Sequence, residues 1–212
     1  MRPQPRASVP EPLIHKVVHL PLILASSSAI RRQMLEAAGV EYQAVPSKVD
    51  ESALKAELNE PGAIAGELAV AKALDVSGGQ PEDWVIGSDS VVSVDGRLFD
   101  KPNSRDEAAD HLRFFSGKTM TLTSAVALAR AGSEDWRHDD AAVLQVRTLS
   151  DDFIERYLDA EWPEVGYCVG VFRLEGRGVQ LFDRIDGNYF TILGMPLIPL
   201  LVALRERGLL ET

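Results

Sequence analysis

Residues 22–32 read LILASSSAIRR, which predicts a strand over 20–25, a turn of small hydroxyl residues and a helix over 29–38. Ser28 is suited to the N-cap of that helix. The free amides of the first helical turn, the serine hydroxyls and the guanidinium groups of Arg31 and Arg32 would then converge on one point. Such a point suits a phosphate group. The alternative is an ordinary capped surface helix whose arginines are solvated.

The composition limits the classes of protein that this chain can belong to. It has 212 residues, 45% of them hydrophobic, and a formal net charge of −10. A hydrophobic content this high predicts a folded core, and the negative charge argues against nucleic acid or an anionic membrane as the main partner. No apolar run approaches the roughly 20 residues of a membrane span, and the first residues lack the apolar segment of a secretory signal.

Four prolines near the start predict a loose tail over residues 1–16, followed by one domain over 17–212. Cys168 is the one cysteine, which excludes an internal disulfide and leads us to expect a cytoplasmic protein. A catalytic thiol is the sharper interpretation of Cys168. A buried structural residue within a strand is the interpretation that its apolar neighbours favour.

Strands and helices alternate along the chain, which predicts an α/β or α+β fold. Further helices are expected over 62–76, after the caps Ser104 and Ser150, and from Pro196 to Gly208. An acidic stretch over 49–52 and a polar segment over 131–140 are expected to be irregular. The expected strands after the first are 84–93, which ends in a hairpin turn at 95–96, and 119–130, 141–148, 167–173 and 178–185.

Asp89 lies inside an otherwise apolar strand, in the run Trp84-Val85-Ile86-Gly87-Ser88-Asp89-Ser90-Val91-Val92. A carboxylate there loses hydration and needs a cation, a metal ion or hydrogen-bond donors. Asp89 is therefore a candidate general base or metal ligand. The alternative is an aspartate satisfied by neighbouring backbone amides.

Several other charged residues indicate a site only when they are considered together. Asp50 and Glu51, predicted to lie on a loop, suit a hard cation such as Mg²⁺. Lys101 follows a hairpin and precedes a proline, and Lys72 lies in an alanine-rich helix, so both could reach a cleft or simply face solvent. Glu175 lies next to a glycine turn and could accept two N–H groups of a guanine-like base. The four histidines lack the spacing of a zinc site.

In this order, the motifs resemble the Maf family of nucleoside triphosphate pyrophosphatases. The resemblance covers about residues 20–208, and no glycine-rich Walker loop is present. The matching segments are Leu24–Arg32, Asp50-Glu51, Lys72, Gly87–Val91, Lys101-Pro102, Ser116–Thr119 and Gly194–Leu197.

The resemblance implies an elongated, two-lobed α/β fold with a central, twisted mixed sheet, similar to the inosine triphosphatase fold, and a homodimer. It implies hydrolysis of a nucleoside triphosphate to the monophosphate and pyrophosphate with Mg²⁺ or Mn²⁺. Asp89 would accept the proton of water and, with Glu51, hold the metal. The residues that would bind the phosphates are Ser26, Ser28, Arg31, Arg32, Lys72 and Lys101.

Three positions bear on the base, namely Ile30, Ser90 and Glu175. Ile30 and Glu175 are similar to the branch of the family that acts on 7-methyl-GTP, whereas Ser90 matches neither that branch nor the one that acts on dTTP and UTP. The sequence therefore favours 7-methyl-GTP, with a dTTP/UTP pyrophosphatase as the alternative. Two further alternatives are a nucleotide-binding regulator of cell division without turnover and a structural domain without a site.

Overall fold

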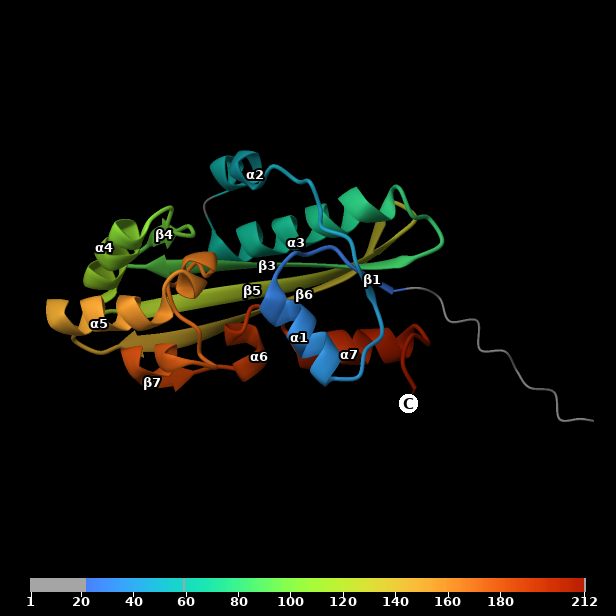
Figure 1. Cartoon of the computed structure of the whole chain (residues 1–212). Helices are drawn as coiled ribbons and strands as arrows, with labels where there is room; N and C mark the ends of the chain where they lie inside the picture. The colour runs from blue at the N-terminus through green and yellow to red at the C-terminus, as the bar shows by residue number, and fades with distance from the viewer. Residues whose placement is uncertain (1–21, 59, 212) are drawn as a thin grey trace, which may run out of the picture.

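One elongated mixed β-sheet runs through the protein (Figure 1). The computed structural model describes residues 22–58 and 60–211, so the tail predicted over 1–16 lies outside the described residues. In the described part, β1 is parallel to β2 and β3, and every other pairing is antiparallel. The predicted α/β class with a central mixed sheet is confirmed. The strand order is β2-β1-β3-β5-β6-β7, with β4 beside β3; their bounds are β1 Leu22–Leu24, β2 Gln43–Ala44, β3 Trp84–Val94, β4 Arg97–Phe99, β5 Thr119–Arg130, β6 Ser133–Val146 and β7 Phe182–Asp186.

Helices cover both faces of this sheet (Figure 1). The helix α3 lies on one face, where it packs on the odd-numbered side chains of β3 and β5. The helices α1 and α7 lie on the other face against the even-numbered side chains. The bounds are α1 Ala29–Ala37, α2 Glu51–Glu57, α3 Pro61–Ser77, α4 Arg105–Phe115, α5 Asp151–Glu161, α6 Tyr189–Ile192 and α7 Leu197–Glu206, with the 3₁₀ turns η1 Glu164–Tyr167 and η2 Arg177–Leu181.

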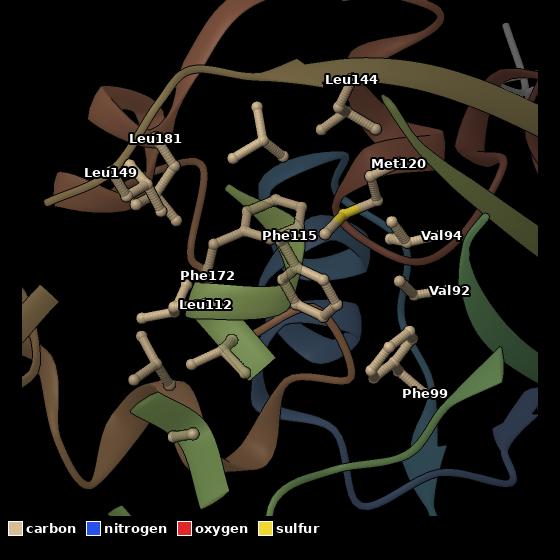
Figure 2. Close-up of a cluster of buried hydrophobic side chains, with 14 of the residues drawn as sticks. Val92, Val94, Phe99, Leu112, Phe115, Met120, Leu144, Leu149, Phe172 and Leu181 are labelled. Atoms are coloured by element: carbon tan, nitrogen blue, oxygen red, sulfur yellow. The ribbon is translucent and has the colours of Figure 1, made fainter. Parts of the chain in front are cut away.

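Hydrophobic cores at the two ends of the sheet define two lobes. One core joins α4 and α5 to the end of the sheet formed by the last residues of β3 and β6 and the first residues of β5. Phe115, Met120 and Leu144 are fully buried in it (Figure 2). The other joins β1, α1 and α7 to the opposite ends of β3 and β5. The segment between these cores is where β3 carries its polar residues.

Gly87 allows α3 to lie directly on β3. A Cβ atom at this position would be 2.0 Å from the carbonyl oxygen of Ala69 and 2.7 Å from the amide nitrogen of Ala73. Any larger residue would force the helix away from the strand. The close contact brings Lys72 of α3 within reach of Asp89 on β3.

Several predicted elements agree with the structure and four do not. The helices predicted over 29–38 and 62–76 and the serine caps at Ser104 and Ser150 are confirmed. The prediction that the acidic stretch over 49–52 is irregular is wrong, because Asp50 caps α2 by accepting from the amide of Ser52. Glu51, which was predicted to lie in a loop, is therefore the first residue of this helix.

The other three errors concern strands. The polar segment over 131–140 is mostly strand, because β6 begins at Ser133 directly after the turn at 131–132. Its charged side chains are exposed and form surface ion pairs such as Arg137 with Glu67, so they do not interrupt the ladder. The strand predicted over 167–173 is absent and replaced by η1 and a loop, in which Val171 has a φ of 55°. The strand predicted over 178–185 is only partly present, because η2 occupies its first residues and β7 begins at Phe182.

Candidate active site

The polar residues of β3 lie along a stretch of strand edge that no described strand covers. β1 pairs with Trp84 to Ile86 and β4 with Val92 to Val94, both on the side of β3 opposite β5. Residues 87–91 lie between these two partners. A cavity of about 750 Å³ is lined by Asp89 and Ser90 of this segment together with residues from both lobes.

The turn after β1 and the start of α1 form one wall of the cavity, through residues 25–31. Ser28 occupies the N-cap position, as predicted, but its side chain makes no capping hydrogen bond. Its amide instead donates to Oγ of Ser26 at 3.2 Å. The amides of the first helical turn have no partners within the helix, so this wall provides donors for an anion.

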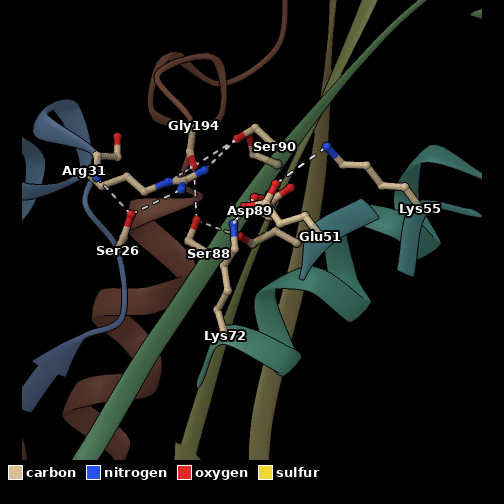
Figure 3. A network of polar contacts seen from close by, with 12 residues as sticks. Ser26, Arg31, Glu51, Lys55, Lys72, Ser88, Asp89, Ser90 and Gly194 are labelled. Carbon is tan, nitrogen blue, oxygen red and sulfur yellow. Dashed lines mark hydrogen bonds and ion pairs between the residues drawn. The ribbon is translucent and has the colours of Figure 1, made fainter. Parts of the chain in front are cut away.

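Arg31 is buried in the same wall and held in one orientation (Figure 3). It donates to the carbonyl of Gly194 at 2.8 Å, to Oγ of Ser90 at 3.1 Å and to Oγ of Ser26 at 3.5 Å. Burial lowers the pKa of its guanidinium, and the negative charges of Asp89 and Glu51 partly oppose that effect. Arg32, by contrast, is exposed and is not among the residues of the cavity wall.

The side chain of Asp89 lies on the face of the sheet opposite Arg31, where Lys72 contacts both Asp89 and Glu51 (Figure 3). Nζ of Lys72 is 2.5 Å from Oδ1 of Asp89 and 2.7 Å from Oε1 of Glu51. The side chains of Asp89 and Lys72 are only 9% and 10% exposed, so the pair is largely withdrawn from water. Lys72 was predicted either to reach a cleft or to face solvent, and the structure places it at the cavity.

Several positively charged side chains surround Glu51. Burial alone would raise the pKa of its carboxyl, but the hydrogen bond from Lys72 and the charges of Lys72, Lys55 and Lys101 outweigh burial and lower it. Lys55, which the sequence analysis missed, lies in the cavity wall and contacts Asp100 at 2.6 Å. Its spacing of four residues from Glu51 would have revealed it if α2 had been recognised as a helix.

Residues around η1 and the loop that follows it line the opposite part of the cavity. Glu175 lies there and accepts from Nε of Arg173 at 3.3 Å. Ile30 and Ser90, the other two positions expected to bear on the base, also line the cavity, as does the exposed Lys101. Of the predicted site residues, Arg32 and Asp50 are outside the cavity wall.

A series of hydrogen bonds leads into the interior from Ser90, which accepts from Arg31. Oγ of Ser90 contacts Oγ of Ser124 at 2.8 Å, and Ser124 donates to the carbonyl of Thr191 at 2.8 Å. The hydroxyl of Thr191 in turn donates to Asp140 at 2.6 Å. The sequence did not reveal this series of hydrogen bonds, because its residues come from four separate elements and form no local pattern.

The donor set fits a hard divalent cation. Glu51 and Asp89 offer carboxylate oxygens on two sides of one ammonium group. Mg²⁺ typically takes one or two protein carboxylates and completes its shell with water and substrate phosphates. The described residues contain no group of three or more His, Cys, Asp or Glu side chains that could hold a metal by themselves.

Cys168 lies in the cavity wall with intermediate exposure and not within a strand, so the prediction of a structural residue buried in a strand is wrong. Burial, together with the negative charge of Glu175, raises the pKa of its thiol to about 11. The thiolate, which is the nucleophile, is therefore scarce at neutral pH. This environment does not suit a catalytic thiol.

Alkylation of this single cysteine by iodoacetamide is expected to be slow at pH 8, because a pKa of about 11 leaves a thiolate fraction roughly a hundredfold smaller than in an ordinary thiol. The rate should rise with pH toward a midpoint near 11. Protein unfolded in guanidinium provides the control, in which the thiol should titrate in its ordinary range. A midpoint in the ordinary range for the folded protein would contradict the described surroundings of Cys168.

Comparisons with known proteins identify relatives over nearly the whole described chain. A model of the Maf-like protein family matches residues 21–207. A 7-methyl-GTP pyrophosphatase of Rhizobium etli is 48% identical over 194 residues, which are 90% of this chain and 98% of that protein. A nucleoside triphosphate pyrophosphatase of Nitrobacter hamburgensis is 46% identical over 193 residues, 90% of this chain and 96% of that protein.

Among solved structures, the Ham1 protein of Staphylococcus aureus matches with a TM-score of 0.42 and 13% identity, over 89% of this chain and 99% of that chain. None of the helices in the described residues has the length and apolar character needed to cross a membrane.

Proposed function

This chain belongs to the Maf-like protein family, and on that premise we propose that its cavity hydrolyses a nucleoside triphosphate to the monophosphate and pyrophosphate. The relatives named above agree on the enzyme class, a hydrolase acting on phosphoric anhydrides. The observation that carries the proposal is the meeting of Arg31 and Asp89 at one cavity, from opposite faces of the sheet edge.

The triphosphate is proposed to bind where positive charge gathers. A nucleoside triphosphate carries about four negative charges, and fixed cations in a partly dry site stabilise them more strongly than water does. Ser26, Ser28 and the free amides of α1 would provide hydrogen bonds to the phosphate oxygens. The cations of the cavity wall are Arg31, Lys55, Lys72 and Lys101, in a chain whose net charge is −10. Arg32 was also expected to bind phosphate, but it is exposed and lies outside the cavity wall, so it is not among the phosphate-binding residues proposed.

The chemical step is proposed as attack of water on the α-phosphorus. Asp89 accepts a proton from the water as its oxygen bonds to phosphorus. The bond from the α-phosphorus to the bridging oxygen breaks, and its electron pair leaves with pyrophosphate. Lys72 balances the charge of Asp89 in the resting site, and Arg31 and the lysines stabilise the charge that develops on the leaving group.

Mg²⁺ or Mn²⁺ is proposed as the cofactor, with Asp89 and Glu51 as its protein ligands. When bound, a divalent cation neutralises phosphate charge and polarises the phosphorus–oxygen bonds. Asp89 and Glu51 would hold this cation, and Lys72, which contacts both carboxylates, would lie beside it. From that position Lys72 would contact a phosphate oxygen.

For the base, we propose 7-methylguanine, with a dTTP/UTP pyrophosphatase as the alternative. Support comes from Glu175 and Ile30 in the cavity wall, and from relatives named 7-methyl-GTP pyrophosphatase in Rhizobium etli and Rhizobium meliloti. Other relatives of similar identity are named only nucleoside triphosphate pyrophosphatase. A cytoplasmic location and a homodimer are further expectations.

The proposal is tested by measuring pyrophosphate release from dTTP, UTP, CTP and 7-methyl-GTP, each with Mn²⁺ and with EDTA. We expect metal-dependent release that is fastest with 7-methyl-GTP. No release from any nucleotide would refute the proposed activity, and fastest release from dTTP or UTP would refute the assignment of the base.

A further inference from the structure

We propose that Tyr167 is the surface on which the substrate base stacks, and that with Glu164 and Glu175 it selects a positively charged purine. This inference rests on the proposed function and concerns the same cavity. It adds a stacking residue and a second carboxylate to the site. The resemblance to the family supplied neither of them.

Tyr167 is exposed to an unusual degree for an aromatic side chain in a cavity wall. Its exposed fraction is 70%, the highest among the large hydrophobic residues of the described chain, and the others with high exposure lie outside the cavity wall. When a flat ligand covers an exposed aromatic ring at a concave site, the buried apolar surface makes the free energy of binding more favourable. A purine base offers such a face.

The turn that carries Tyr167 is firmly held. Val165 is completely buried in the core of that lobe. The amide of Gly166 donates to the carbonyl of Pro163 at 2.9 Å, and the amide of Cys168 donates to Val165 at 3.1 Å. A Cβ at Gly166 would be 2.8 Å from the ring of Trp162, so the turn packs directly on that ring. A ring on a preorganised turn loses little entropy when a base stacks on it.

The charges around Tyr167 favour a cationic base. Glu164 and Glu175 line the same cavity. Arg173 contacts Glu175 and the charge of Lys101 also acts on this wall, whereas Glu164 forms no ion pair with the described residues. Methylation of guanine at N7 gives its ring system a positive charge. Such a base stacks on an aromatic face with a cation–π contribution and is attracted by both carboxylates, whereas neutral guanine lacks both terms.

The cavity is therefore polarised to match a zwitterionic nucleotide. Arg31, Lys55 and Lys72 gather with Asp89 at the strand edge, whereas the wall around η1 contributes Tyr167, two carboxylates and Arg173, which contacts one of them. A triphosphate joined to a cationic base carries the complementary charges. Pyrimidine nucleotides match the phosphate-binding groups equally well but gain nothing from the acidic wall.

The test compares 7-methyl-GTP with GTP, two substrates that differ by one methyl group and the charge it confers. We expect wild-type kcat/KM to be at least about tenfold higher for 7-methyl-GTP. Tyr167→Ala should reduce that ratio about tenfold, Tyr167→Phe should preserve it, and Glu164→Gln should reduce it by a smaller factor, about threefold. In Tyr167→Ala and Glu164→Gln, kcat/KM for dTTP should fall by a smaller factor than kcat/KM for 7-methyl-GTP, because a neutral base stacks on the ring without the cation–π and charge contributions.

A binding measurement separates base recognition from catalysis. The fluorescence of the protein is titrated with 7-methyl-GMP and with GMP in the absence of metal, and Tyr167→Ala should weaken binding of the methylated nucleotide by a larger factor than binding of GMP. If the wild type hydrolyses nucleotides but Tyr167→Ala leaves the ratio and both affinities unchanged, the inference is refuted and the proposed function stands. If the wild type hydrolyses none of them, the proposed function itself fails.

Discussion

Replacement of Asp89 by asparagine is expected to lower kcat for pyrophosphate release by about a thousandfold, the loss typical when a positioned general base is removed. The carboxylate is buried, lies at the cavity and contacts Lys72 at 2.5 Å. Asparagine has nearly the same shape but cannot accept the proton of water and is a poorer ligand for a divalent cation. Both effects fall on the chemical step.

The matched control for this substitution is Asp100→Asn. Asp100 also lines the cavity, but its side chain is 74% exposed, and Lys55 is its one ion-pair partner among the described residues. We expect Asp100→Asn to change kcat less than about threefold, in line with the small contribution of exposed ion pairs. Initial rates at saturating nucleotide and Mn²⁺ measure both. An Asp89→Asn protein that keeps a tenth of the wild-type rate would contradict the role of Asp89 as proton acceptor.

Arg31→Ala is the second substitution with a large expected effect, a decrease of about a hundredfold in kcat/KM. Its guanidinium is buried and oriented by Gly194, Ser90 and Ser26, so it meets the phosphates without further ordering. Loss of one such charged donor in a shielded site removes roughly 3 kcal/mol of transition-state stabilisation. Arg31→Lys keeps the charge but not the forked geometry and should restore only part of the activity.

The neighbouring Arg32 is the matched control for Arg31. It has the same chemistry one position along α1, yet it is exposed and outside the cavity wall. We expect Arg32→Ala to reduce kcat/KM less than about threefold, as for a solvated surface charge. Circular dichroism and thermal midpoints should show that both variants are folded. Equal losses in the two variants would mean that the phosphates bind along a different face of α1.

Local signals in the sequence account for much of this architecture. The turn Ser26–Ser28 predicted α1 because small hydroxyl residues before an amphipathic run are strong helix-start signals. Asp89 was identifiable because a charge in an apolar strand conflicts with its surroundings. Both inferences depend on residues that are close in the chain, which is why they could be made without coordinates.

What the sequence did not reveal depends on distant contacts. Lys72 carries no local sign of burial, and only the contact of α3 with Gly87 brings it to Asp89. The helix α2 is seven residues long, too short for a clear periodic pattern, so Lys55 was missed with it. The glycine-rich segment over 167–173 was taken for a strand because its apolar residues alternate, although in the fold they anchor a turn.

If this cavity directs water to the α-phosphorus of a nucleoside triphosphate, the oxygen of that water must end in the monophosphate. Hydrolysis of 7-methyl-GTP in water enriched in ¹⁸O, with Mn²⁺ present and products analysed by mass spectrometry, shows where it goes. We expect equal amounts of monophosphate and pyrophosphate, with the heavy oxygen in the monophosphate. Release of nucleoside diphosphate and orthophosphate, or heavy oxygen in the pyrophosphate, would exclude attack at the α-phosphorus.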